Sequence, residues 1–304
     1  MHDKDSKIPS EQAPFLAPEP DNPALTTQLS GQDATGQPVD LPVVQERAIT
    51  IYLNSQEIIT SMTVGDHVAE MAVGFLFNQH ILTAADEIDS IDVDEELDVV
   101  VVRTHQETGF EAKTKKKIKT SGCAQGTVFA DVMDRFEAAK LPKGTKISAA
   151  ELTALSKTIN HTPSLYLKAG AIHGCVLAKG AEMLLYMEDI GRHNAVDKIA
   201  GVMLMNNISG ADKIFYTTGR LTSEMVIKTV LMGIPILVSR SGFTEAGVRL
   251  ARQAGLTLIG RAKGSRFFVL SGPERVEFAA QLEQETTEQQ SPQRAMTSAK
   301  GQER

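Results

Sequence analysis

The first part of the chain with a regular apolar pattern alternates between apolar and polar residues, with the period of two that is typical of β-strands. Residues 48–53 and 57–62 show this alternation and predict a β-hairpin. A helical period follows over residues 66–80, with Thr63 as the expected cap, and a strand pattern returns at residues 97–102. These elements predict a small α+β unit.

The second half of the chain has a different rhythm, in which short apolar runs alternate with helical segments. Residues 148–160 predict a helix that opens on a capping box of Ser148 and Glu151. The predicted elements after it are strands 172–178 and 183–187, helix 193–205, strand 213–217, helix 223–232, strand 236–239, helix 245–254 and strands 256–259 and 266–270. This alternation predicts an α/β layered fold with a mostly parallel or mixed sheet.

Composition adds a tail at each end of this folded region. Residues 1–42 hold seven of the twelve prolines and one aromatic residue, Phe15, and residues 281–304 are rich in Gln, Glu, Thr and Ser. Such segments bury too little apolar surface to become ordered, so we expect both tails to be disordered. The remaining chain divides into an N-terminal α+β subdomain at 43–147 and an α/β domain at 148–280.

Charge and cysteine content narrow the function classes. The formal net charge of -7 argues against a general nucleic-acid binder but leaves room for a local basic pocket. No apolar run is long enough to span a membrane, and the first residues lack the apolar core of a signal peptide, so we expect a cytoplasmic protein. Two cysteines make no disulfide framework, and without Cys-x-x-Cys or His-x-x-x-His spacing we expect no zinc site.

One cysteine, Cys123, follows a lysine cluster and is flanked by glycines. No acidic residue occurs between Glu111 and Asp131. Neighbouring cations, and the N-terminus of a helix predicted at 128–139, favour the thiolate over the thiol. A thiolate is the form that nucleophilic and sulfur-transfer chemistry require. The alternative is a buried cysteine in a turn, with the lysines forming a solvated face.

Three polar loops follow predicted strands of the second half, at residues 188–198, 217–224 and 239–244. In an α/β sheet the carboxyl ends of strands are where ligands bind. Backbone N–H groups at helix starts, together with guanidinium groups, suit a phosphate or pyrophosphate. The alternative for each loop is an ordinary capped helix start. The candidate binding residues are Arg192, His193, Gly219, Arg220, Ser239 and Ser241.

A fourth candidate loop lies between the last two predicted strands and carries three cations and two glycines. It suits an anion, and its alternative is a charged hairpin at a sheet edge. His173 and Cys175 lie on an apolar strand, where we expect a core histidine and a buried cysteine. The candidate residues of this loop are Arg261, Ala262, Lys263, Gly264, Ser265 and Arg266.

Together these segments resemble the formate dehydrogenase accessory sulfurtransferases, the FdhD family. The resemblance is carried by the motif EDIGRHNAVDK at 188–198 and by the blocks at 219–226, 233–239 and 255–266. Similarity runs from about residue 46 to residue 270, which is nearly all of the predicted folded region.

The resemblance implies a cytidine-deaminase-like fold for the C-terminal domain, without the deaminase zinc residues, and a homodimer in the cytoplasm. It implies binding of a molybdenum or tungsten bis-molybdopterin guanine dinucleotide cofactor, with residues 261–266 at the position of the family's cofactor-binding segment. It also implies that Cys123 accepts sulfur from a cysteine desulfurase as a persulfide. The sulfur would then go to the metal and activate formate dehydrogenase.

The chain departs from the family pattern at Gly126, where many members have the second cysteine of a Cys-x-x-Cys pair. One thiol is enough to carry one sulfur, but release must then use reduction at the metal, an outside thiol or Cys175. Two other functions stay open. One is a chaperone that inserts the cofactor, with Cys123 only lining the site, and the other is a hydrolase that pairs Cys123 with His193.

Overall fold

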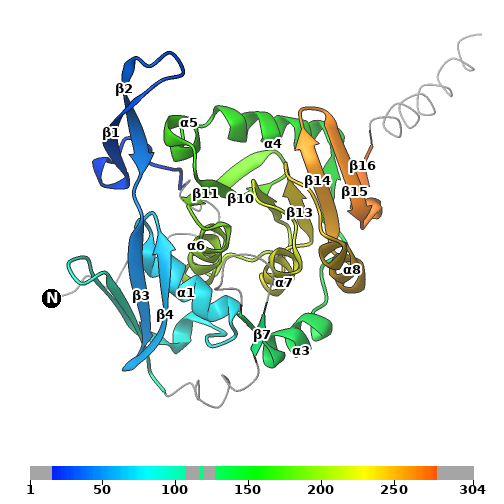
Figure 1. Cartoon of the computed structure of the whole chain (residues 1–304). Helices are drawn as coiled ribbons and strands as arrows, with labels where there is room; N and C mark the ends of the chain where they lie inside the picture. The colour runs from blue at the N-terminus through cyan, green and yellow to red at the C-terminus, as the bar shows by residue number, and fades with distance from the viewer. Residues whose placement is uncertain (1–15, 107–116, 120–126, 279–304) are drawn as a thin grey trace, which may run out of the picture.

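The computed structural model describes residues 16–106, 117–119 and 127–278 (Figure 1). Within these residues a smaller sheet near the start of the chain lies beside a larger sheet built from the second half. The predicted α/β class, with a mixed sheet and a smaller α+β unit before it, is confirmed. No helix in the described ranges is long and apolar enough to cross a membrane.

The smaller sheet has four strands among the described residues, and α1 (Val68–Asn78) packs on it. The predicted hairpin is confirmed as β3 and β4, whose inward residues Ile49, Ile51 and Leu53 form a core with α1. Strand β5 has no counterpart in the sequence-based prediction. In order across the sheet, the strands are β4 (Gln56–Thr63), β3 (Arg47–Leu53), β6 (Val99–Thr104) and β5 (Ile88–Asp94).

The larger sheet has six strands in the described part of the chain. Its strands β12, β13 and β14 are parallel to one another, while β10 and β15 run antiparallel to their neighbours. In order across the sheet, the strands are β11 (Glu182–Asp189), β10 (His173–Lys179), β12 (Ile214–Thr217), β13 (Ile236–Ser239), β14 (Thr257–Lys263) and β15 (Arg266–Ser271).

Helices cover both faces of this sheet, because successive strand residues point to opposite sides. On β12, Phe215 faces a core shared with α6 (Arg192–Met205), α7 (Ser223–Leu231) and α8 (Glu245–Ala254). Its neighbour Tyr216 faces the core under α4 (Ala149–His161). The capping box of Ser148 and Glu151 is confirmed at the start of α4. Helix α3 (Ala130–Ala138), predicted at 128–139, buries Val132 and Phe136 beside α7.

Two helices join the smaller and the larger unit. Helices α1 and α6 lie against each other (Figure 1) and approach closely at Gly74 and Gly201. A Cβ atom added at Gly74 would lie 1.8 Å from the carbonyl oxygen of Asp197. One added at Gly201 would lie 1.9 Å from that of Glu70. Glycine is therefore what allows the two backbones to touch.

The prediction that residues 1–42 are disordered is wrong for residues 16–42. Leu16 bridges to Leu185, and β1 (Thr26–Gln32) pairs with β2 (Pro38–Val44). The physical reason is that Leu25 is buried against Leu165 and other residues far along the chain, contacts that composition does not reveal. Residues 1–15 and the predicted tail at 281–304 lie outside the described residues.

The expected cap at Thr63 is also wrong. Thr63 ends β4, and its hydroxyl donates a hydrogen bond to Asp189, while α1 begins after His67. The Thr63 hydroxyl therefore binds a buried carboxylate instead of a backbone N–H group at the start of α1. The remaining short elements are η1 (Pro23–Leu25), η2 (Ala85–Glu87), β7 (Lys117–Lys119), β8 (Thr127–Phe129), β9 (Ile147–Ser148), α5 (Leu165–Ala169), η3 (Pro273–Arg275) and β16 (Val276–Glu277).

Candidate functional site

A pocket of about 1170 Å³ opens beside the ends of β12 and β13. Its wall includes the whole of the fourth predicted loop, residues 261–266, together with Ser241. The carboxyl ends of the parallel strands meet at one edge, so loops distant in sequence come together there. The other lining residues are Asn160, Tyr166, Tyr216, Thr218, Arg240, Gly242, Phe267, Phe268 and Phe278.

The basic loop is shaped by a tight connection between β14 and β15. Lys263 pairs with Arg266, and Gly264 between them has a φ of 59°, which glycine adopts without steric cost. Arg261 also has a positive φ, of 53°, and its N–H donates to the carbonyl oxygen of Ser241 at 2.7 Å. This hydrogen bond fixes the hairpin to the loop that follows β13.

Four cations surround the pocket: Arg240, Arg261, Lys263 and Arg266. No carboxylate in the described part of the chain forms an ion pair with any of them. The guanidinium of Arg240 lies over the ring of Tyr166, 4.5 Å from its centroid, which is a cation–π geometry. Uncompensated positive charge beside aromatic rings suits a ligand that carries both anionic and planar groups.

The other predicted binding residues form a second group next to the pocket rather than part of its lining. Nε2 of His193 lies 3.1 Å from Oε2 of Glu224. The hydroxyl of Ser239 donates to the carbonyl oxygen of Gly219 at 2.6 Å and accepts from the N–H of Ser241 at 2.9 Å. The predicted binding residues therefore form two groups, one that lines the pocket and one that lies beside it. Ser239 links the two groups, because it contacts both Gly219 and Ser241. The members of this second group are Arg192, His193, Gly219, Arg220 and Ser239.

His193 of this second group and the nearby His173 are both held in the neutral form. Burial, together with the charges of Lys228 and Arg192, lowers the pKa of His193 to about 2. Burial also lowers the pKa of His173, again with help from Arg192. His173 was expected in the core and is half-buried, with its Nδ1 3.4 Å from the hydroxyl of Thr218. Neutral imidazoles can accept or donate a hydrogen bond but carry no charge to bind an anion.

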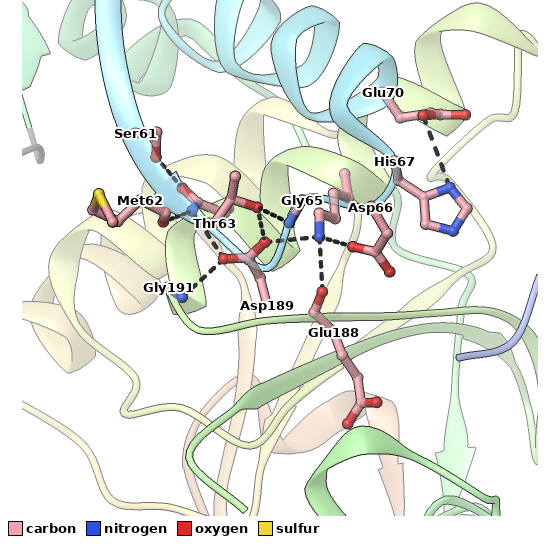
Figure 2. A network of polar contacts seen from close by, with 12 residues as sticks. Ser61, Met62, Thr63, Gly65, Asp66, His67, Glu70, Glu188, Asp189 and Gly191 are labelled. Carbon is pink, nitrogen blue, oxygen red and sulfur yellow. Dashed lines mark hydrogen bonds and ion pairs between the residues drawn. The ribbon is translucent and has the colours of Figure 1, made fainter. Parts of the chain in front are cut away.

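Several residues of the motif at 188–198 contact β4 and the residues that precede α1, and they thereby join the larger unit to the smaller one (Figure 2). Nζ of Lys198 lies 2.7 Å from Oδ2 of Asp189. It also contacts the carboxylate of Asp66, which precedes α1 in the sequence. Asn194 donates to Asp189 at 2.9 Å and to the carbonyl oxygen of Met62 at 2.8 Å. Burial alone would lower the pKa of Lys198, but the two carboxylates outweigh it and hold the pKa above its usual value.

A second buried ion pair completes this junction. Nζ of Lys228 on α7 donates to both carboxylate oxygens of Asp197 at 2.8 and 2.9 Å. Asn78 at the end of α1 donates to the same carboxylate at 2.6 Å. Breaking such a pair leaves a buried charge without a partner, so these residues fix the geometry from which the site loops project.

The structure describes one of the two cysteines, Cys175, but not the other. Cys123 lies outside the described residues, so its role and its pairing with His193 stay predictions. Cys175 is fully buried, as expected, and its thiol donates to the hydroxyl of Thr217 at 3.4 Å. Burial raises the pKa of Cys175 to about 12. A protonated, inaccessible thiol is a poor partner for sulfur exchange.

Nine of the residues that line the pocket were not among the sequence candidates, and two of them, Arg240 and Tyr166, form its cation–π pair. Arg240 lies between the candidates Ser239 and Ser241, so the signal was present as a cation in a loop already singled out. Tyr166 lies on α5, a helix of five residues, which is too short to show a helical period.

Comparison with known proteins gives one consistent result. The family model described as FdhD/NarQ family matches residues 44–277. The sulfur carrier protein FdhD of Bacillus subtilis is 32% identical over 235 residues, covering 77% of this chain and 90% of the relative. That of Listeria innocua is 31% identical over 245 residues, covering 80% and 94%.

A solved structure gives the same answer at the level of the fold. The crystal structure of a formate dehydrogenase accessory protein from Desulfotalea psychrophila is similar to this chain with a TM-score of 0.68 and 29% identity. It covers 83% of this chain and 99% of its own. With the family model spanning both units and the pocket, the chain belongs to the FdhD/NarQ family.

Proposed function

We propose that this protein is a sulfur carrier that takes part in the maturation of formate dehydrogenase. The observation that carries the proposal is the family match over residues 44–277, supported by relatives named as sulfur carrier proteins over most of their own length. The cytoplasmic location, the homodimer and a cysteine desulfurase as sulfur donor are expectations from the same resemblance.

Cys123 is the residue that we propose carries the sulfur. Its thiolate would attack the outer sulfur of a persulfide on the desulfurase, forming a new S–S bond while the thiolate of the desulfurase leaves. The exchange is balanced and needs no external oxidant or reductant. The lysines before Cys123 favour both the thiolate and the anionic persulfide.

The pocket is proposed to hold the guanine dinucleotide part of the molybdenum or tungsten cofactor, which is the acceptor of the sulfur. Four cations without described carboxylate partners fit phosphate groups, and the aromatic rings beside them fit a planar base. The volume of about 1170 Å³ is ample for a nucleotide. The residues present therefore fit the proposed ligand.

Release of the sulfur has fewer routes than the sequence suggested. Cys175 is buried and protonated, which argues against its use as the resolving thiol. With glycine at position 126, we propose that the sulfur leaves through reduction at the metal or through an outside thiol.

The carrier function is tested by the mass of the intact protein after incubation with a cysteine desulfurase and cysteine. We expect a gain of one sulfur, ~32 Da, that is reversed by a thiol reductant and absent in Cys123→Ala. Cys175→Ser is the matched control and should gain the same mass. No sulfur gain, together with full maturation of formate dehydrogenase by Cys123→Ala, would contradict the carrier and support the cofactor-inserting chaperone.

A further inference from the structure

Glu188 opens the family motif, and its backbone and side chain serve different parts of the molecule. Its carbonyl oxygen accepts a hydrogen bond from Nζ of Lys198 at 2.9 Å, within the junction of the two units. Its side chain points away from that junction (Figure 2). The residue is only 2% exposed, so its carboxyl group must find partners inside the protein.

The partners of the carboxyl group are on the short helix α5. Its oxygens accept from the N–H of Leu165 at 2.6 Å and from that of Tyr166 at 3.2 Å. These are the first two residues of α5, whose backbone N–H groups have no partner inside the helix. Glu188 is thus the tertiary anchor that fixes where α5 begins.

Helix α5 in turn supplies part of the pocket wall. Tyr166 lines the pocket, and its ring is the platform over which the Arg240 guanidinium lies. Tyr166 is 41% exposed, so little packing of its own holds the ring in place. The orientation of Arg240 therefore depends on the position of the α5 backbone.

From these contacts we propose that Glu188 is a positioning residue for the pocket, which anchors α5 and thereby holds Tyr166 and Arg240 in the geometry that receives the ligand. The part of this inference that concerns the ligand rests on the proposed function. The part that concerns the anchor does not.

The charges around Glu188 make the anchor sensitive to pH. The pKa of Glu188 is raised to about 7, chiefly by burial and also by Asp66, against the lowering effect of the two N–H groups and Lys198. Tyr186 also faces the carboxyl group, and its own raised pKa keeps it neutral. An opening of α5 that hydrates Glu188 returns the pKa toward 4.5 and so releases a proton near neutral pH. Opening is therefore expected to increase as pH rises from 5.5 to 8.

Hydrogen exchange tests the anchor without any ligand. The readout is the protection factor of the amides of Leu165 and Tyr166 in the full chain, with amides of β13 as the reference for global folding. In the wild type we expect protection to fall by on the order of tenfold between pH 5.5 and pH 8. Glu188→Gln keeps an acceptor oxygen but has no proton to release, so its protection should not change with pH. Glu188→Ala should lose protection at every pH.

Two control variants separate Glu188 from other groups. Glu182→Gln makes the same change at an exposed position on the same strand and should behave as the wild type. His67→Asn removes the histidine in front of α1 whose pKa is raised by Glu70, and asparagine tolerates its left-handed backbone. Its pH profile at α5 should match that of the wild type. Wild-type and Glu188→Gln profiles that coincide would overturn the proton-linked anchor.

Binding of GDP tests whether the anchor serves the pocket. We expect Glu188→Ala to bind GDP about tenfold more weakly than the wild type, and Glu188→Gln to restore most of the affinity. Loss of α5 protection in Glu188→Ala with unchanged GDP affinity would overturn the positioning role. Absence of GDP binding in every variant, with the exchange results as expected, would count against the pocket assignment instead.

Discussion

His193 at the start of α6 is a neutral residue in a positively charged setting. Burial lowers its pKa to about 2, so the folded protein does not take up the proton that the unfolded chain binds below pH 6.5. Its Nδ1 is buried without a hydrogen-bond partner among the described residues, and its Nε2 faces Glu224. A histidine in this state can take part in hydrogen bonding beside the site, but it costs stability as the solution becomes acidic.

Replacing His193 by asparagine should reduce the acid sensitivity of the protein. Because the unfolded state binds more protons than the folded state below pH 6.5, the free energy of unfolding falls as pH drops, by up to about 1.4 kcal/mol per pH unit for this group. Urea unfolding between pH 7.5 and 5 measures the slope, which should be shallower in His193→Asn. Equal slopes in the two proteins would show that His193 is not held neutral.

Cys175 should be chemically silent in the folded protein. It is fully buried and its pKa is raised to about 12, so both access and thiolate are lacking. In the Cys123→Ala background, where Cys175 is the remaining cysteine, iodoacetamide at pH 7.5 should add no label to the native protein and one label in urea. Rapid labelling of the native protein would restore Cys175 as a candidate for sulfur release.

The elements show what sequence patterns can and cannot predict. The loops at 188–198, 217–224 and 239–244 were predicted to share one sheet edge, and the directions of β11, β12 and β13 place the carboxyl ends of these strands at the same edge. The ordered segment in front of β3 was missed because it depends on Leu25 packing against α5. The motif at 188–198 was interpreted as a binding loop, although its residues Asp189, Asp197 and Lys198 are used in buried ion pairs. The sequence cannot distinguish a ligand-binding group from a member of a buried ion pair, because the same residue types serve both roles and only their partners in the folded protein differ.

The crossing of α1 and α6 gives a prediction at this scale. Gly74→Ala places a methyl group against the backbone of Asp197, which cannot move without separating the helices. We expect a loss of about 3 kcal/mol or more in the free energy of unfolding, measured with urea. Gly144→Ala is the matched control, since a Cβ there meets nothing within 4 Å. A loss no larger than that of the control would mean that the helices are not in direct backbone contact.

At the scale of the whole molecule, a net charge of -7 coexists with one pocket surrounded by four cations. The junction of α1, α6 and β4 is buried, and the motif at 188–198 reaches the pocket wall through Glu188, which holds the first residues of α5. This division explains why one short motif carries both structural ion pairs and site residues. It also concentrates positive potential where an anionic cofactor would bind, in a molecule that repels anions elsewhere.

Titration with GDP by calorimetry tests the pocket, which is the central claim, most directly. The wild type should bind GDP with an affinity that falls as salt increases, because the contacts are charged. Arg261→Ala, Lys263→Ala and Arg266→Ala should each bind about tenfold more weakly and with a reduced salt dependence. Arg249→Ala removes an exposed cation of α8 that does not line the pocket, and it should bind as the wild type does. Equal GDP affinity in all four variants and the wild type would contradict the assignment of the pocket.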